Sequence, residues 1–263
     1  MSETQVSSLS SELDREAVID FDGVVARFGN LHAMGPAKLT VRRGEFLAIV
    51  GPSGCGKSTL LNMVAGTLSP TEGEVRYKGD LVTKINYDVG YITQKNYCLP
   101  WRTVEANVSL PLEFRRYPKT EIQSRVRAAL QKVGLRGFEK AYPKQLSGGM
   151  LQRVMIARTL AYSPDVYLMD EPFGSLDAQL RTRMHSELLK LWQETGATFM
   201  FVTHDLHEAI TLADRVVVMS KRPGRIKRIL DIDLPRPRDV IDIQGNPAFG
   251  AYFKTLWADL DVH

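Results

Sequence analysis

The residues best suited to chemistry form a glycine-rich run with a lysine and hydroxyls, followed at once by an apolar helical pattern. Glycines let the backbone curl so that several N–H groups point at one phosphate chain, at the positive end of the next helix. Lys57 is placed to reach the β- and γ-phosphates of a nucleotide, and the Ser58 hydroxyl is a magnesium ligand. The alternative is a glycine-rich turn with an exposed lysine. We therefore predict a P-loop whose nucleotide-binding residues are Gly51, Pro52, Ser53, Gly54, Cys55, Gly56, Lys57, Ser58 and Thr59.

Two adjacent carboxylates, Asp170 and Glu171, follow an apolar strand-like run from Val166 to Met169. Buried carboxylates cost free energy unless a cation pairs with them, so Asp170 is predicted to hold magnesium, directly or through water. Glu171 is then free to orient or deprotonate the water that attacks a phosphate. The alternative is that both carboxylates simply leave the strand into solvent as a turn begins at Pro172.

A second anion site is predicted at Leu146, Ser147, Gly148 and Gly149. Ser147 is a good helix N-cap, and the two glycines leave the N–H groups of the helix start uncovered. The chain would then have two phosphate-binding helix starts for one nucleotide. A head-to-tail pair of chains resolves this, because each second helix start can close the γ-phosphate of the partner's site. Taken in isolation, an ordinary Ser-Gly-Gly helix start is the simpler interpretation.

Composition excludes several classes of protein. The chain has 263 residues, 44% of them hydrophobic and 24% charged, which is typical of a globular protein. No apolar run approaches the roughly 18 residues that span a bilayer, and the polar first residues predict no secretory signal peptide. Two cysteines, Cys55 and Cys98, are too few for a disulfide scaffold and favour a reducing cytosol. The net charge of +4 suits phosphate ligands but is too small to predict a nucleic-acid partner.

Strands that alternate with helical patterns predict an α/β fold with a mainly parallel sheet. Apolar runs at 46–50, 166–169, 198–202 and 216–219 are typical of strands buried on both faces. Strand patterns at 18–21 and 24–28, with turns at Gly23 and Gly29, belong to a predicted N-terminal β layer, and a further strand is predicted over 230–234. Thr120 and Gln123 are predicted to form a capping box that opens a helix ending at Gly134; a later helix is predicted to end at Gly196.

The order of these motifs resembles that of the ATP-binding subunit of an ABC transporter, from Phe28 to Ser220. Gly51 to Ser58 matches Walker A, Leu146 to Gly149 the signature, and Val166 to Asp170 Walker B. The resemblance implies that Glu171 is the catalytic glutamate and His204 the switch histidine, and that Gln94 of the Q-loop joins Ser58 and Asp170 around magnesium. It also implies a D-loop at Ser175, Leu176 and Asp177, and adenine stacking by Phe28, where Tyr is commoner. The alternative for Phe28 is an ordinary core residue.

The same resemblance implies a Mg²⁺-dependent ATPase with an antiparallel N-terminal β layer and an inserted helical subdomain. The domains we expect are a flexible leader at 1–16, an ATP-binding core at 17–96, a helical signature subdomain at 97–161, the rest of the core at 162–220 and a C-terminal extension at 221–263. The ATPase is expected to dimerise with itself or a related subunit and to drive a separate membrane permease, fed by a solute-binding protein. It is expected at the cytoplasmic face of the inner membrane.

Residues 99–103, 224–226 and 234–238 are similar to the importer branch for nitrate, sulfonates and taurine. In segment 99–103, the residues expected to contact the permease are Leu99, Trp101 and Arg102. The alternative is that Trp101 fills the crevice between two lobes. Three other functions are possible for a chain with a P-loop. A soluble non-transport ABC ATPase usually carries two cassettes or a coiled coil, a P-loop kinase or GTPase would not need Ser147 to Gly149, and a nucleotide-dependent regulatory module would tolerate loss of Glu171 or His204.

Three further expectations concern single residues. Cys55 is predicted to be a reactive thiolate, because Lys57 and a helix N-terminus lie beside it; the alternative is a shielded, inert thiol. The fifth residue of the signature is Met150, where the family that the chain resembles more often has Gln. Ser147 therefore has no capping-box partner at the start of its helix. The remaining histidines show no metal-ligand spacing and are given no role: His32, His185, His207 and His263.

Overall fold

A six-stranded sheet lies at the centre of the computed structural model, which describes residues 16–95 and 97–260. Its strands run in the order β10-β9-β3-β8-β7-β6, and each neighbouring pair is parallel except β10 with β9. Every position of β3, β7 and β8 is buried, which explains their continuous apolar sequences. The strands are β3 (Phe46–Val50), β6 (Val89–Ile92), β7 (Val166–Asp170), β8 (Thr198–Val202), β9 (Arg215–Met219) and β10 (Ile226–Asp231).

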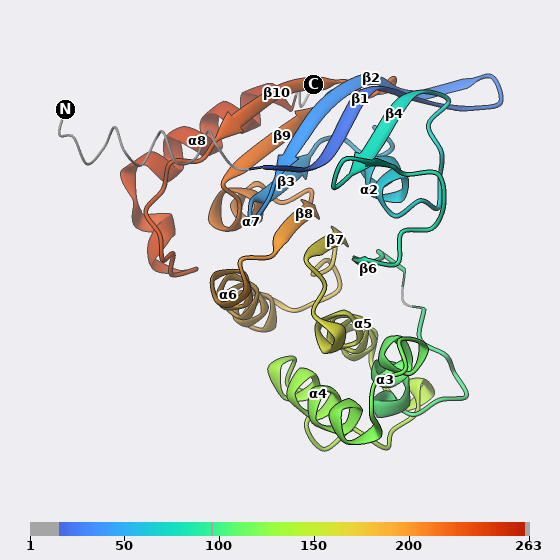
Figure 1. Ribbon diagram of the computed structural model, residues 1–263. Helices are drawn as coiled ribbons and strands as arrows, with labels where there is room; N and C mark the ends of the chain where they lie inside the picture. The colour runs from blue at the N-terminus through green and yellow to red at the C-terminus, as the bar shows by residue number, and fades with distance from the viewer. Residues whose placement is uncertain (1–15, 96, 261–263) are drawn as a thin grey trace.

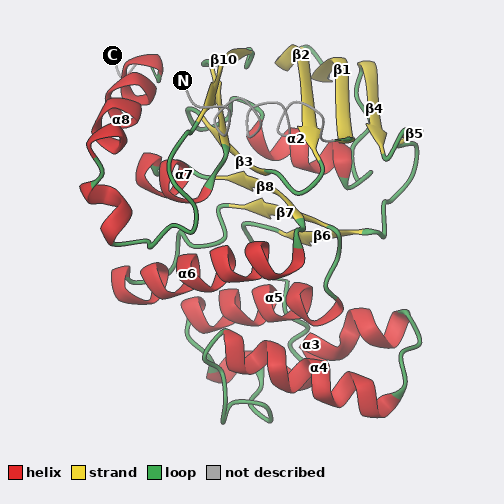
Figure 2. Cartoon of the chain, turned by 60° about the vertical axis from the view of Figure 1, so that its left-hand side comes forward, coloured by secondary structure: helices red, strands yellow, loops and turns green. Residues whose placement is uncertain are grey.

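A second, antiparallel sheet has the strand order β2-β1-β4-β5 and lies across helix α2 (Lys57–Val64) from the first (Figure 2). Its strands are β1 (Ala17–Phe28), β2 (Leu31–Arg42), β4 (Glu72–Tyr77) and β5 (Asp80–Leu81). The predicted turn at Gly23 is wrong. Gly23 has a φ of 61° and lies where the register with β2 shifts, so it forms a bulge within one continuous strand.

Helices α5 (Gly148–Tyr162) and α6 (Ala178–Thr195) cover the face of the central sheet that is remote from α2 (Figure 1). Helices α3 (Val104–Phe114) and α4 (Lys119–Lys132) pack on α5 and extend the molecule away from the sheet. Helix α7 (Leu206–Leu212) follows β8, and α8 (Pro247–Asp259) packs on α7. Short 3₁₀ helices span Pro143–Gln145 and Asp242–Gly245. Among the described residues, no helix is both long and apolar enough to cross a membrane.

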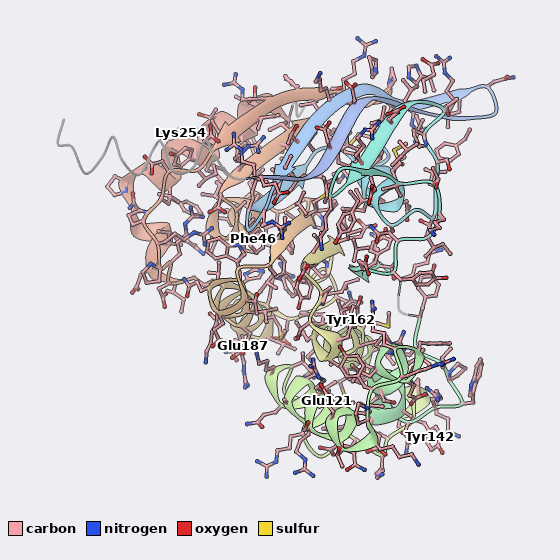
Figure 3. All side chains as sticks on the ribbon, in the orientation of Figure 1. Phe46, Glu121, Tyr142, Tyr162, Glu187 and Lys254 are labelled. Atoms are coloured by element: carbon pink, nitrogen blue, oxygen red, sulfur yellow. The ribbon has the colours of Figure 1, made fainter. Side chains whose placement is uncertain are left out.

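Two apolar cores fill the spaces on either side of the central sheet. On the side of α5 and α6, three aromatic rings from adjacent strands stack in a row: Phe46 on Phe199 with centroids 5.0 Å apart, and Phe199 on Tyr167 at 4.6 Å. Figure 3 shows Phe46 in the sheet and Glu187 on the neighbouring helix α6. The rings lie near the amino ends of the three strands, and the parallel pairing of β3 with β8 and of β8 with β7 brings their carboxyl ends side by side, where functional side chains begin.

Several sequence predictions for single elements can be compared with the structure. The capping box of Thr120 and Gln123 is wrong, because α4 begins at Lys119 and its N-cap, Pro118, has no side-chain hydrogen bond. The stops at Gly134 and Gly196 are confirmed by left-handed φ values of 66° and 62°. The strand predicted over 230–234 is shifted: β10 ends at Asp231. The leader predicted for residues 1–16 lies, except for Glu16, outside the described residues, as does His263.

The C-terminal segment is fastened to the core by the buried side chain of Arg238. Burial lowers the pKa of this guanidinium to about 10. The guanidinium donates hydrogen bonds to backbone carbonyls at the end of α7 and in the segment after β10, and so connects the two segments. These carbonyls belong to Ile210, Thr211, Ala213, Ile232 and Leu234.

Candidate functional site

The predicted P-loop joins β3 to α2 and curls around an open helix start. Gly54 and Gly56 have left-handed φ values of 74° and 102°, which glycine adopts without strain. Helix α2 has no side-chain cap, so the N–H groups of its first turn remain available to an anion. Lys57 lies inside the loop, and its Nζ donates to the carbonyls of Gly51 at 2.8 Å and Pro52 at 3.0 Å.

The outer wall of the P-loop is the segment between β9 and β10, which sequence reasoning missed. A Cβ on Gly224 would lie 1.7 Å from the carbonyl oxygen of Cys55, so only glycine fits there. Gly224 is also bonded to β2, through Gly224 N–H to Ala33 O at 3.0 Å and Gly35 N–H to Gly224 O at 2.7 Å. The Arg222 guanidinium donates to Gly54 O at 3.2 Å. The P-loop is therefore held from outside as well as by Lys57.

Asp170 ends β7 beside the P-loop and is buried. The pKa of this carboxyl is raised, mainly because the group is buried. The hydrogen bond with Ser58 lowers the pKa, the charge of Glu171 raises it further, and the charge of Lys57 lowers it. A buried carboxylate with a hydroxyl at hand matches the oxygen donor set that Mg²⁺ prefers. The predicted magnesium ligands Ser58 and Asp170 are thus brought together, and the residues present fit a divalent cation.

Two of the three predicted catalytic residues, Gln94 and His204, converge on the carboxylate of the third, Glu171. Gln94 Nε2 donates to Glu171 Oε2 at 3.0 Å, and His204 Nδ1 lies 3.5 Å from the same oxygen. They follow β6, β7 and β8, which are neighbours in the sheet. Glu171 has a φ of 47°, an unusual value for a non-glycine residue, and its N–H is held by Val202 O at 3.0 Å. The backbone thus leaves the strand abruptly and projects the carboxylate toward Gln94 and His204.

The predicted second anion site lies at the start of α5. Ser147 caps this helix, because its hydroxyl accepts a hydrogen bond from Met150 N–H at 3.3 Å; the predicted N-cap is confirmed. Ser147 and Gly148 are exposed, and a Cβ on Gly148 would meet nothing within 4 Å. A Cβ on Gly149 would lie 3.4 Å from Leu176 Cδ2 and 3.4 Å from the carbonyl oxygen of Ser175, so this glycine is close to the predicted D-loop. The helix start is open to an approaching anion.

The predicted D-loop connects β7 to α6. Asp177 is the N-cap of α6, since its Oδ1 accepts from Leu180 N–H at 3.0 Å. Leu176 is buried, and its carbonyl accepts a hydrogen bond from Arg181 Nη2 at 3.0 Å. Ser175, which precedes Leu176, is exposed.

Phe28 and Trp101 are both exposed, which contradicts the alternative that either is a core residue. Phe28 ends β1 with 49% of its surface accessible, and stacking on adenine needs an accessible ring. Trp101 is 71% exposed. It belongs to the loop from Tyr97 to Thr103, which we call the tryptophan loop.

The tryptophan loop is held by buried polar groups although Trp101 is exposed. Asn107 of α3 is fully buried; it accepts from Leu99 N–H at 2.8 Å and donates to the carbonyls of Leu99, Arg102 and Thr103. Arg158 of α5 binds Asn107 Oδ1 at 2.7 Å and Tyr97 O at 3.1 Å. Arg102 is ion-paired with Glu113 at 2.7 Å.

The prediction that Cys55 is a reactive thiolate is wrong. The side chain is buried beneath the P-loop, and desolvation raises the pKa of the thiol despite the nearby charge of Lys57. The alternative, a shielded thiol, is the one that the structure supports. Sequence spacing placed Cys55 beside Lys57 correctly but could not show that it points into the core.

Comparison with known proteins agrees with this arrangement. Residues 34–174 match the family model described as ABC transporter. An uncharacterized ABC transporter ATP-binding protein of Methanocaldococcus jannaschii is 49% identical over 227 residues, which cover 86% of this chain and 83% of that protein. The aliphatic sulfonates import ATP-binding protein SsuB of Bacillus cereus is 43% identical over 210 residues, covering 80% and 82%.

Among solved structures, a dimeric ATP-binding cassette bound to ADP and Pi is 32% identical and superposes with a TM-score of 0.75. The superposition covers 82% of this chain and all of that one. The predicted α/β fold, with a mainly parallel sheet and a separate antiparallel sheet, is confirmed. The chain therefore belongs to the ABC transporter family, as an ATP-binding cassette of the kind that couples ATP hydrolysis to transport.

Proposed function

We propose that this chain hydrolyses ATP with Glu171 as the general base and powers solute import through a separate permease. The observation that carries the proposal is the convergence of Gln94 and His204 on the Glu171 carboxylate, next to the magnesium-type pair of Ser58 and Asp170. A carboxylate placed beside a phosphate cradle can accept the proton of an attacking water. The amide and the imidazole keep it oriented.

Ser58, Asp170 and Gln94 would hold Mg²⁺, whose charge when bound offsets that of the phosphate oxygens. The N–H groups of Gly54 to Thr59 would bind the phosphate chain, and Lys57 would exchange its loop carbonyls for phosphate oxygens. Phe28, half exposed at the end of β1, would stack on adenine. Each of these residues binds or orients, and the bond-breaking step is left to the water and Glu171.

The open helix start of α5 supports a dimer of ATPase subunits. Ser147 and Gly148 are exposed, and a Cβ on Gly148 would meet nothing within 4 Å. In a head-to-tail pair, Leu146 to Gly149 of one subunit would cover the γ-phosphate held by the other. The similarity to a cassette solved as a dimer with ADP and Pi supports this arrangement.

The tryptophan loop is the surface that we assign to the permease. Leu99, Trp101 and Arg102 lie in a loop that is held rigid, and an exposed tryptophan on a rigid loop is a favourable anchor for a protein partner. The subunit would then work at the cytoplasmic face of the inner membrane, with a solute-binding protein outside. Similarity to SsuB supports a small anionic solute such as a sulfonate, taurine or nitrate.

The test is Glu171→Gln in the full chain. The amide keeps an oxygen that can accept from Gln94 but is no longer a base, so we expect ATP turnover to fall on the order of 10²-fold or more with ATP binding retained. The trapped ATP should also stabilise a dimer that is visible by size-exclusion chromatography with ATP and Mg²⁺. Glu187→Gln, the same change on α6 (Figure 3), is the control and should leave turnover unchanged. Normal turnover in Glu171→Gln would refute the assignment.

A further inference from the structure

We infer that the buried carboxylate of Glu208 is a positioning group that holds the backbone on both sides of His204 and connects it to the D-loop. The inference rests on the proposed role of His204 in hydrolysis. It concerns Glu208, His185 and Arg181, none of which touches the reacting atoms. Together with Thr203 we call these residues the Glu208 hub.

Glu208 lies on α7 and is only 7% exposed, so its two oxygens are satisfied by protein groups. Oε2 accepts from the Thr203 hydroxyl at 2.5 Å, and Oε1 lies 3.1 Å from His185 Nε2. Arg181 Nε is buried without a hydrogen bond among the described residues and lies 4.0 Å from Oε1. A buried carboxylate with such partners is fixed in one place, because any movement would leave a charge unpaired.

The residues before and after His204 are both tied to this carboxylate. Thr203, which precedes His204, donates its hydroxyl to Glu208. The same hydroxyl oxygen accepts from the N–H of Asp205, the residue after His204, at 3.0 Å. Asp205 in turn caps α7 by accepting from the N–H groups of His207 and Glu208. The exposed His204 ring is therefore carried by a backbone whose flanks are held from the buried side.

Arg181 connects the same hub to the D-loop. Its Nη2 donates to the carbonyl of Leu176 at 3.0 Å, and its Nη1 lies 3.9 Å from Asp205 Oδ2. His185, one turn further along α6, also touches the turn after Glu171, because the Phe173 ring meets its imidazole edge-on with centroids 5.0 Å apart. The turn after Glu171, the D-loop and the His204 segment thus meet at one cluster behind the site.

This geometry predicts an effect on hydrolysis rather than on ATP binding. Within the part of the chain that the structure describes, none of the hydrogen bonds of the hub involves the P-loop or Phe28, which we assign to nucleotide binding. Loosening the hub should let His204 move relative to Glu171, whose oxygen is 3.5 Å away. Such a misplacement lowers kcat and leaves the affinity for ATP unchanged.

The experiment measures ATPase kinetics and fluorescent-ATP affinity of the full chain carrying Glu208→Gln. We expect kcat to fall at least about fivefold, with the Kd for ATP within about twofold of the unchanged protein. His185→Gln retains a side-chain N–H that can reach Glu208 and should keep kcat, whereas His185→Leu should lose it. Glu187→Gln on α6 is again the control.

A double-mutant cycle with His204→Ala separates positioning from general destabilisation. If Glu208 acts through His204, Glu208→Gln should lower kcat no further in the His204→Ala background. Equal losses in both backgrounds, unchanged kcat in Glu208→Gln, or a parallel loss of ATP affinity would overturn the inference. If Glu208→Gln fails to fold, Thr203→Val and His185→Leu can each replace it in the double-mutant cycle with His204→Ala. Unchanged turnover in His204→Ala alone would instead refute the proposed role of His204.

Discussion

Replacing Gly224 by alanine tests whether the segment after β9 holds the P-loop in place. The new Cβ would lie 1.7 Å from Cys55 O, far inside the 3.4 Å at which ordinary contacts begin, so the two must move apart by more than 1 Å. Gly224 cannot easily retreat, because its N–H and carbonyl are both bonded to β2. We expect the P-loop to move, at a cost of about 1–3 kcal/mol in the free energy of unfolding.

The displacement of the P-loop should have its largest effect on the affinity for the nucleotide. A hydrogen bond to a charged group contributes about 1.5–3 kcal/mol, so misplacing one P-loop N–H lowers affinity roughly ten- to hundredfold. Titration with a fluorescent ATP analogue, alongside a thermal melt, measures both quantities. Gly250→Ala in α8 is the matched control, since a Cβ there meets nothing within 4 Å. Wild-type affinity and melting temperature in Gly224→Ala would refute the close packing of this wall against the P-loop.

Three further outcomes are expected. Trp101→Ala should leave the free energy of unfolding within about 0.5 kcal/mol, because the side chain is exposed, and should abolish co-purification with the permease; an early melt would point to a role in folding instead. Cys55 should be alkylated more slowly than the less buried Cys98 in the folded chain, as followed by mass spectrometry, and faster labelling of Cys55 would contradict its burial. Phe28→Ala should weaken fluorescent-ATP binding by about 0.5–1.5 kcal/mol, whereas Phe28→Tyr should not; equal affinities of all three proteins would remove Phe28 from the adenine site.

The parts of the fold predicted from sequence are those that depend on local pattern. The strands β3, β7, β8 and β9 could be predicted because a strand that is buried on both faces has a continuous apolar sequence, with no alternation of apolar and polar residues. The end of the helix at Gly196 could be predicted because glycine readily adopts the left-handed conformation that often terminates a helix. Gly23 has the same conformation within β1, so a glycine pattern alone could not distinguish a turn from a bulge.

The parts that were missed depend on contacts between residues distant in sequence. Gly224 lies 169 positions after Cys55, and nothing in its local sequence shows that it touches the P-loop. Glu208 and His185 are on different helices, and their partnership exists only once α6 and α7 are packed. Thr120 failed as a cap because Pro118 and Lys119 start the helix earlier, which the capping pattern alone does not reveal.

The carbonyl cluster around Arg238 makes the C-terminal extension part of the ATPase core rather than an appendage. The last carbonyls of a helix have no partners within it, and such groups usually turn to water or to a nearby side chain. Here the carbonyls of Ile210, Thr211 and Ala213 accept hydrogen bonds from the guanidinium of Arg238, which comes later in the chain. A chain shortened before Arg238 would leave these oxygens buried and unbonded at the base of the helix that carries Glu208. Trimming the extension to a minimal cassette would therefore need a substitute hydrogen-bond donor at this position.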